Sequence, residues 1–164
     1  MVNSAELLNM FKENNVRYHL YEHAPLKKAE DADFIRHKVK GVICKTLFLT
    51  DDNEAYWLVT VPLEVRVDLK KLAQQLGSGR LSFGDEQAMR IFLGVLPGSV
   101  TPLAVINDTE NKVGLVLEQS IMQHDMVNVH PLINTLSVDL SPRQIVMFAE
   151  DFGHDPLFVK DICV

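Results

Sequence analysis

The stretch Gly41–Thr50 constrains the fold most, because it is an apolar run of strand-forming residues that a single lysine, Lys45, interrupts. Its length and its β-branched and aromatic content predict a core strand. Alternation along a strand puts Ile43, Lys45 and Leu47 on one face. An ammonium group among aliphatic side chains either reaches water along its stem or faces a cavity that supplies an anion, a dipole or water. The stretch therefore predicts either a lysine that extends from a sheet edge or a cation at the floor of a pocket.

The segments around this strand alternate irregularly between helix and strand, with capping and turn signals at their ends. Helices are expected over Ala5–Glu13, Ala29–Lys38, Asp68–Leu76, Asp85–Leu93 and from Ser141 to Gly153; strands are expected over Arg17–His23, Ala55–Val61, Leu103–Asn107, Val113–Leu117, Val127–His130, Leu136–Leu140 and Leu157–Val159. The pattern includes two hairpins, one after Gly41–Thr50 and one joining Leu103–Asn107 to Val113–Leu117. It predicts an α+β (mixed α/β) fold, with a mixed curved sheet flanked by helices in a single domain over residues 1–164.

The charge distribution limits the nucleic-acid hypothesis. The net charge is −6, and residues 101–164 hold 3 basic against 9 acidic residues, while residues 1–100 hold 13 of each. The segment Lys27–Lys45 is a modest basic patch, which could meet a few phosphates or be a solvated helix face. No apolar run is long enough for a signal peptide or membrane span, so we expect a cytoplasmic protein. Two cysteines without C-x-x-C spacing predict no disulfide.

The familiar catalytic and metal-binding motifs are missing. His19 and His23 are four apart but fall on an expected strand and its exit, and no H-E-x-x-H is present, so neither a metal nor a cofactor is expected. The glycine-rich stretch Gly77–Gly84 fits neither a P-loop nor a dinucleotide fingerprint. No G-x-S-x-G occurs, and alternation turns Cys44 away from Lys45. The sequence therefore predicts no side chain that acts as a covalent nucleophile.

Three features remain as candidates for chemistry: Lys45, the loop Gly98-Ser99-Val100-Thr101-Pro102, and His130. In such a loop glycine lets backbone N–H groups converge on a carbonyl oxygen, as ester hydrolysis requires, although a plain tight turn has the same composition. His130 precedes a proline and could be structural or catalytic. None of the three is specific alone.

Four segments together resemble the bacterial YbaK-type editing domains, which are related to the insertion domain of prolyl-tRNA synthetase. They are CKTLFL at Cys44–Leu49, VDLKKLAQQLGSGRLSF at Val67–Phe83, LGVLPGSVTPLAVIND at Leu93–Asp108 and VNVHPLIN at Val127–Asn134. The resemblance covers nearly the whole chain. It is strongest to the free-standing, ProX/PrdX-like branch that deacylates alanine mischarged on proline tRNA, and weaker to the branch that clears cysteine.

This resemblance implies a hydrolase for carboxylic esters, an aminoacyl-tRNA deacylase that edits in trans. A pocket built for proline cannot exclude the smaller alanine, so a second and smaller sieve must hydrolyse the product. Lys45 matches the family's essential lysine, Gly98 and Pro102 match the ends of its G-x-x-x-P loop, and His130 lies in the matching VNVHP segment. In similar proteins the 2′-hydroxyl of the terminal adenosine and a water carry the reaction, while the protein positions the ester.

The implied partners are the acceptor end of tRNA(Pro) and, as an option, prolyl-tRNA synthetase, with no cofactor. Thr46 stands where many relatives have asparagine, and alternation points it away from Lys45. Two alternatives remain open. One is a deacylase for Cys-tRNA(Pro) or another small aminoacyl ester, and the other is a catalytically silent module that binds tRNA or a small ligand.

Overall fold

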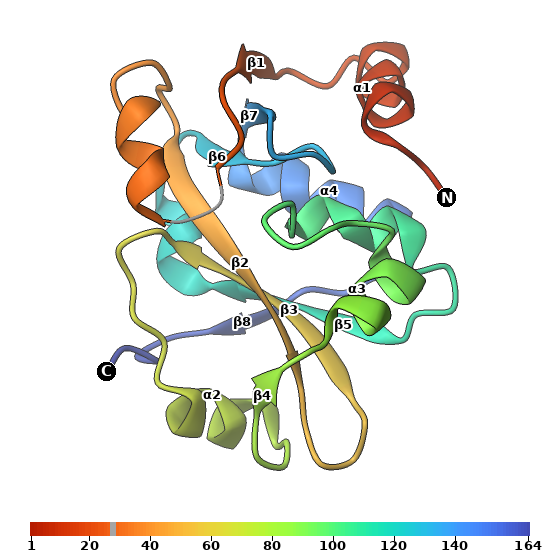
Figure 1. Cartoon of the computed structure of the whole chain (residues 1–164), viewed down its shortest axis with the longest axis vertical. Coiled ribbons are helices and arrows are strands. Elements are labelled where there is room, and N and C mark those ends of the chain that lie inside the picture. The colour runs from red at the N-terminus through yellow and green to blue at the C-terminus, as the bar shows by residue number, and fades with distance from the viewer. Residues whose placement is uncertain (27–28) are drawn as a thin grey trace.

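A mixed sheet of eight strands organises the chain, in a computed structural model that describes residues 1–26 and 29–164 (Figure 1). The strands are β1 (His19–Glu22), β2 (Val42–Thr50), β3 (Tyr56–Pro62), β4 (Ser82–Phe83), β5 (Val113–Glu118), β6 (Val127–Val129), β7 (Leu136–Leu140) and β8 (Leu157–Val159). Their order is β1-β7-β6-β2-β3-β5-β8, and β4 pairs with β2. The sheet contains both parallel and antiparallel pairs, which confirms the predicted mixed α/β class.

Four α-helices and three 3-10 helices cover the described parts of this sheet. They are α1 (Ser4–Glu13), α2 (Leu69–Leu76), α3 (Glu86–Leu93), α4 (Pro142–Asp151), η1 (Ala29–Phe34), η2 (Pro102–Asn107) and η3 (Gln119–Gln123). Asp68, Asp85 and Ser141 cap α2, α3 and α4, and each lies at the expected start of its helix. The cap of α1 is Asn3, which forms a reciprocal capping box with Glu6.

Strand β2 is shared by two half-sheets. One contains β1, β7 and β6, and the other contains β3, β4, β5 and β8. Along one edge it pairs with β3 from Cys44 to Thr50. Along the other edge β6 pairs only at Val42 and Ile43, and β4 only at Leu49 and Thr50. No strand of the described chain therefore covers this second edge around Thr46. The half-sheets separate there, and the separation opens room beside Lys45.

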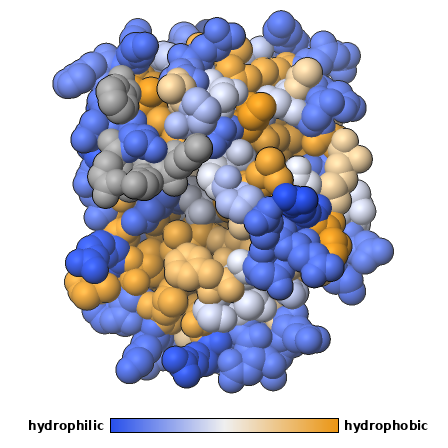
Figure 2. All heavy atoms as spheres, in the orientation of Figure 1, coloured by the Kyte–Doolittle hydropathy of each residue, from blue (hydrophilic) through white to orange (hydrophobic). Residues whose placement is uncertain are grey.

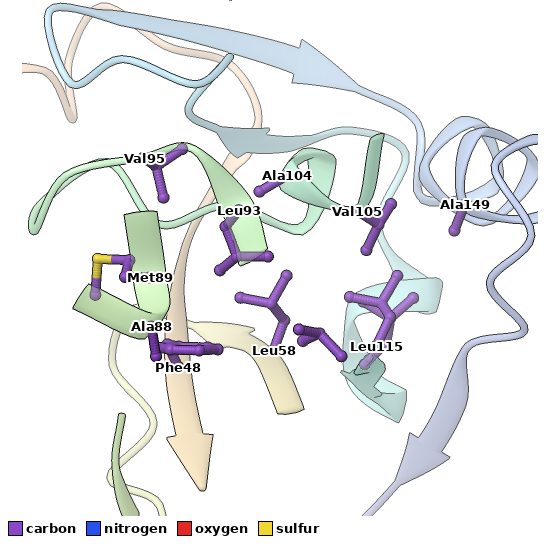
Figure 3. Close-up of a cluster of buried hydrophobic side chains, with 12 residues drawn as sticks. Phe48, Leu58, Ala88, Met89, Leu93, Val95, Ala104, Val105, Leu115 and Ala149 are labelled. Atoms are coloured by element: carbon purple, nitrogen blue, oxygen red, sulfur yellow. The ribbon is translucent and has the colours of Figure 1, made fainter. Parts of the chain in front are cut away.

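Three apolar clusters fix the direction in which β2 presents its side chains. Phe48 packs with Leu58 and Leu115 under α3 and η2, as Figure 3 shows. Leu49 packs on the opposite face in a cluster that includes Leu72 of α2, and Cys44 packs against the cluster that lies under α1 and α4. Burying each such leucine contributes about 1.5–3 kcal/mol, so a one-residue slip of β2 would be strongly opposed.

The helix expected over Ala29–Lys38 is shorter and tighter than predicted. The chain forms the 3-10 helix η1, Ala29–Phe34, and then turns. Ala32 and Ile35 are buried three residues apart, and the Ile35 N–H donates to the Ala32 carbonyl, so one apolar contact every three residues suits the tighter helix. Lys27 and Lys28, which belong to the expected basic patch, lie outside the described residues.

The second expected hairpin is wrong, because Leu103–Asn107 belongs to the 3-10 helix η2. Every residue from Pro102 to Asn107 is buried, and a fully buried short run carries no periodicity that separates helix from strand. The start signal was present, since Thr101 accepts from the Leu103 N–H and Pro102 follows it as the first helical residue. Strand β5 pairs instead with β3, in parallel.

The face seen in Figure 2 includes exposed apolar areas. Apolar atoms gather over the lower centre of this view, where β4 lies beside β2 in Figure 1. Phe83 of β4 and Ile91 of α3 are 65% and 57% exposed. Among the described residues, no helix is both long and apolar enough to cross a membrane.

Candidate functional site

A small pocket of about 230 Å³ lies where the two half-sheets separate. Strand β2 gives one wall, β6 and the residue after it give another, and η1 and the loop before η2 complete it. The lining residues are Leu26, Ala32, Ile35, Ile43, Cys44, Lys45, Thr46, Leu63, Gly98, Val100, Asn128, Val129 and His130. Sites for drug-sized ligands usually have roughly 300–1,000 Å³, so this pocket suits a smaller ligand.

Lys45 is held in this pocket by its place in β2, opposite Val61 of β3. Its side chain is half-buried, and its ammonium group has neither an ion pair nor a hydrogen bond with any described residue. Burial lowers the pKa of Lys45, the negative charge of Glu64 opposes this effect, and the charge of Arg66 adds to it. An ammonium in this setting gains most from an anionic or strongly polar ligand.

Asn128 is the pocket residue that sequence reasoning missed. It pairs with Ile43 of β2, so it shares a sheet face with Ile43 and Lys45. It is 2% exposed, and its Nδ2 donates to Asp139 of β7 at 2.9 Å. Alternation from Asn128 to His130 could have shown that these two share a face, but their approach to Lys45 depends on a parallel pairing that no local sequence signal gives.

Asp139 of β7 holds the Asn128 side chain in place. It is fully buried and accepts hydrogen bonds from the Tyr21 hydroxyl at 2.7 Å, the Gly41 N–H at 3.2 Å and the Lys40 N–H at 3.3 Å, besides Asn128. A Cβ atom on Gly41 would come within 2.6 Å of the Asp139 carboxylate, so the start of β2 can approach only as glycine. The network sets the position of Asn128 and of the strand that carries Lys45.

His130 also lines the pocket. Its Nδ1 lies 3.0 Å from the Leu136 carbonyl oxygen, and since a carbonyl only accepts, Nδ1 carries the hydrogen. Nε2 then presents a lone pair, and no described residue donates to it. Burial lowers the pKa of His130, the bond to Leu136 opposes this, and His23, whose ring centroid is 6.2 Å away, adds to it. His130 is therefore a neutral hydrogen-bond acceptor near pH 7.

The predicted loop reaches the pocket through only two of its five residues. Gly98 and Val100 line it, and neither of their N–H groups donates to another described residue. Gly98 has φ = 88°, and a Cβ there would meet Asn134 Nδ2 at 3.2 Å. Ser99 and Thr101 are buried outside the lining, and Pro102 starts η2.

The Cys44 thiol is a poor nucleophile although it borders the pocket. Burial and, to a smaller extent, the charge of Glu118 raise its pKa to about 12, so almost no thiolate exists at neutral pH. Cys163 is exposed, and both cysteines are free. Among the described residues, no group of three or more His, Cys, Asp or Glu side chains could hold a metal ion.

Iodoacetamide should therefore label Cys163 and leave Cys44 unlabelled in the folded protein at about pH 8. We expect one adduct by intact mass, on the C-terminal peptide, and two adducts after denaturation in urea. Labelling of Cys44 in the native protein at the rate of Cys163 would contradict the buried, protonated thiol.

The fold and this site define a mixed α/β protein with a small pocket, lined in part by Lys45, Asn128 and His130, at a break in its sheet. The chain belongs to the aminoacyl-tRNA editing domain family, whose model matches residues 23–148.

Individual proteins are similar over most of the chain. Prolyl-tRNA synthetase associated domain-containing protein 1 from Bos taurus is 38% identical over 151 residues, covering 88% of this chain and 87% of that protein. The prolyl-tRNA editing protein ProX from Acetoanaerobium sticklandii is 33% identical over 143 residues, covering 87% of each. A crystal structure described as a candidate trans-editing enzyme for prolyl tRNA synthetase has a TM-score of 0.71 at 17% identity and covers 98% of this chain and 99% of its own. That structural likeness shows the fold.

Proposed function

We propose that this protein is a trans-editing deacylase that hydrolyses the ester of alanine mischarged on tRNA(Pro). The observation that carries the proposal is Lys45, an ammonium without a partner among the described residues, in a pocket of about 230 Å³. A pocket of this size favours a small acyl group over a large one. The relatives named for prolyl-tRNA editing support the choice of tRNA.

The reaction needs three things that the pocket residues could supply. Lys45 would hold the terminal phosphate or the carbonyl end of the ester. The N–H groups of Gly98 and Val100 are available donors for the oxyanion that forms when the ester carbonyl is attacked. His130 would accept a hydrogen bond from the bound aminoacyl end.

No side chain is needed as nucleophile in this scheme. A water would attack the ester carbonyl with the 2′-hydroxyl of the terminal adenosine assisting, as the resemblance to editing domains implies. The bond from the carbonyl carbon to the ribose oxygen would break, and that oxygen would leave with a proton. The protonated Cys44 fits that scheme. The substrate forms during translation, so the proposal puts the protein in the cytoplasm. Prolyl-tRNA synthetase is the proposed partner, since it makes the mischarged tRNA.

The test is to measure amino acid release from tRNA(Pro) charged with alanine, cysteine, serine or proline. We expect release from Ala-tRNA(Pro) well above the spontaneous rate and little from Pro-tRNA(Pro). Preferred release from Cys-tRNA(Pro) would correct the amino acid and keep the enzyme class. If no ester is cleaved faster than without protein, the deacylase proposal is wrong. A catalytically silent module that binds tRNA or a small ligand then becomes the better interpretation.

The rate of deacylation should fall at acid pH through the pKa of His130, which lies below the ordinary value of 6.5. Below that pKa the imidazole is protonated and no longer accepts a hydrogen bond, while above it the neutral ring persists, so kcat/KM rises with pH and then levels. The measurement is a pH profile from about 4.5 to 7.5, corrected for spontaneous hydrolysis. His130→Gln keeps an acceptor that does not titrate and should flatten the acid limb; an unchanged limb would remove His130 from the reaction.

A further inference from the structure

The pocket is lined by groups that can only donate hydrogen bonds and by atoms that can only accept them. Lys45 and the N–H groups of Gly98 and Val100 can only donate, and all three lack partners among the described residues. His130 Nε2 and Asn128 Oδ1 can only accept. A phosphate or ester oxygen can accept hydrogen bonds from the donors, but neither a phosphate nor an ester has a hydrogen to give to the two acceptor atoms.

The free acceptor of Asn128 follows from its neighbour. Asp139 is a carboxylate that accepts, so the amide nitrogen of Asn128 must face it, at 2.9 Å. The oxygen is then the atom left over, and no described residue donates to it. Oδ1 has no partner among the described residues but is not completely buried, although the residue as a whole is only 2% exposed. Since Asn128 lines the pocket, the surface that remains to it opens there.

The second acceptor is fixed in the same way by the chain around it. The Leu136 carbonyl takes the Nδ1 hydrogen of His130, and the neighbouring carbonyl of Thr135 accepts from the His23 N–H at 3.0 Å. His23 in turn donates its Nδ1 hydrogen to the Ala24 carbonyl at 2.9 Å. Both imidazoles thus have their hydrogen on Nδ1. Asn128 of β6 and His130, the residue after β6, are two apart along an extended segment, so their side chains point the same way, and both residues line the pocket.

We propose that Asn128 and His130 recognise the free α-ammonium group of the aminoacyl ester. This inference rests on the proposed deacylase function and adds a requirement to it, namely a protonated amine next to the ester. The cationic Lys45 repels such an amine, so the acceptor pair also sets the orientation: ammonium toward β6, and ester toward Lys45 and the Gly98 loop. Burial keeps the pKa of His130 low, so its acceptor persists beside a cation.

The test compares Ala-tRNA(Pro) with the lactyl ester of the same tRNA, which replaces the amine by a hydroxyl of similar size. At about pH 6.5 the α-amine is largely protonated. We expect the wild-type protein to prefer the alanyl ester by about tenfold or more in kcat/KM, relative to the two spontaneous rates, as a charge-assisted hydrogen bond implies. Because this arm uses the unaltered protein, no folding defect can obscure it.

A second experiment tests whether Asn128 causes the preference for the alanyl ester. Asn128→Ala should reduce the alanyl-to-lactyl ratio toward one, whereas a merely structural loss would lower both rates equally and leave the ratio unchanged, which would overturn the assignment. Equal cleavage of the two esters by the wild type would overturn the inference and leave the deacylase function standing. Cleavage of neither ester would remove both.

Discussion

Lys45→Met should lower kcat/KM for Ala-tRNA(Pro) by about 10²–10³-fold, the loss usual when a donor to developing charge is removed. Methionine has similar length and fills the space among the aliphatic neighbours of Lys45, but it cannot donate. The measurement is release of labelled alanine under single-turnover conditions. A variant that keeps more than a third of the wild-type rate would take Lys45 out of the reaction.

The same change should leave the fold intact or slightly more stable. The pKa of Lys45 is lower in the folded chain than in the unfolded one, so between the folded value and 10.5 the unfolded state binds more protons and stability rises with pH. Below that window the charged ammonium opposes folding. Lys45→Met removes this cost, and because the side chain is only half-buried we expect a rise in Tm of about 1 °C. Lys12→Met, on the exposed part of α1, is the matched control for both rate and Tm.

Asp139→Ala should lower the free energy of unfolding by about 3–5 kcal/mol, the largest stability effect that we expect from a polar site. The carboxylate is fully buried, and its loss leaves Asn128 Nδ2 and the Gly41 N–H without their acceptor. Urea denaturation followed by circular dichroism measures the change.

Asp155→Ala is the control for that change, since Asp155 is exposed and should shift stability by no more than about 0.5 kcal/mol. If the two alanine variants unfolded at the same urea concentration, the network around Asp139 would have no energetic importance. An intact but inactive Asp139→Ala protein would instead separate its effect on Asn128 from its effect on the fold.

Much of the fold was predictable because its signals are local. Asp68, Asp85 and Ser141 mark helix starts through their own side-chain oxygens, and alternation in β2 gave the face on which Lys45 lies. The two differences from prediction, at 29–38 and 103–107, concern short buried segments where propensity is weak and the surrounding core decides the conformation.

The site was predictable only in part, for a related reason. Lys45, Gly98 and His130 stand in recognisable segments, and the structure brings these three to one pocket together with Val100. Ser99, Thr101 and Pro102 belong to the same loop, but burial of this loop turns them elsewhere. Asn128 and Asp139 carry no local signal, because their importance arises from the pairing of β6 with β2 and β7.

The strand shared by the two half-sheets has a consequence for cooperativity. Strand β6 pairs with one end of β2 and β4 with the other, so the two half-sheets are not hydrogen-bonded to each other along the middle of β2, where the pocket lies. A ligand bound in the pocket contacts both half-sheets at once, so it opposes their separation. Its binding should slow amide hydrogen exchange in β6 and β3 together, although these strands do not touch each other in the sheet order.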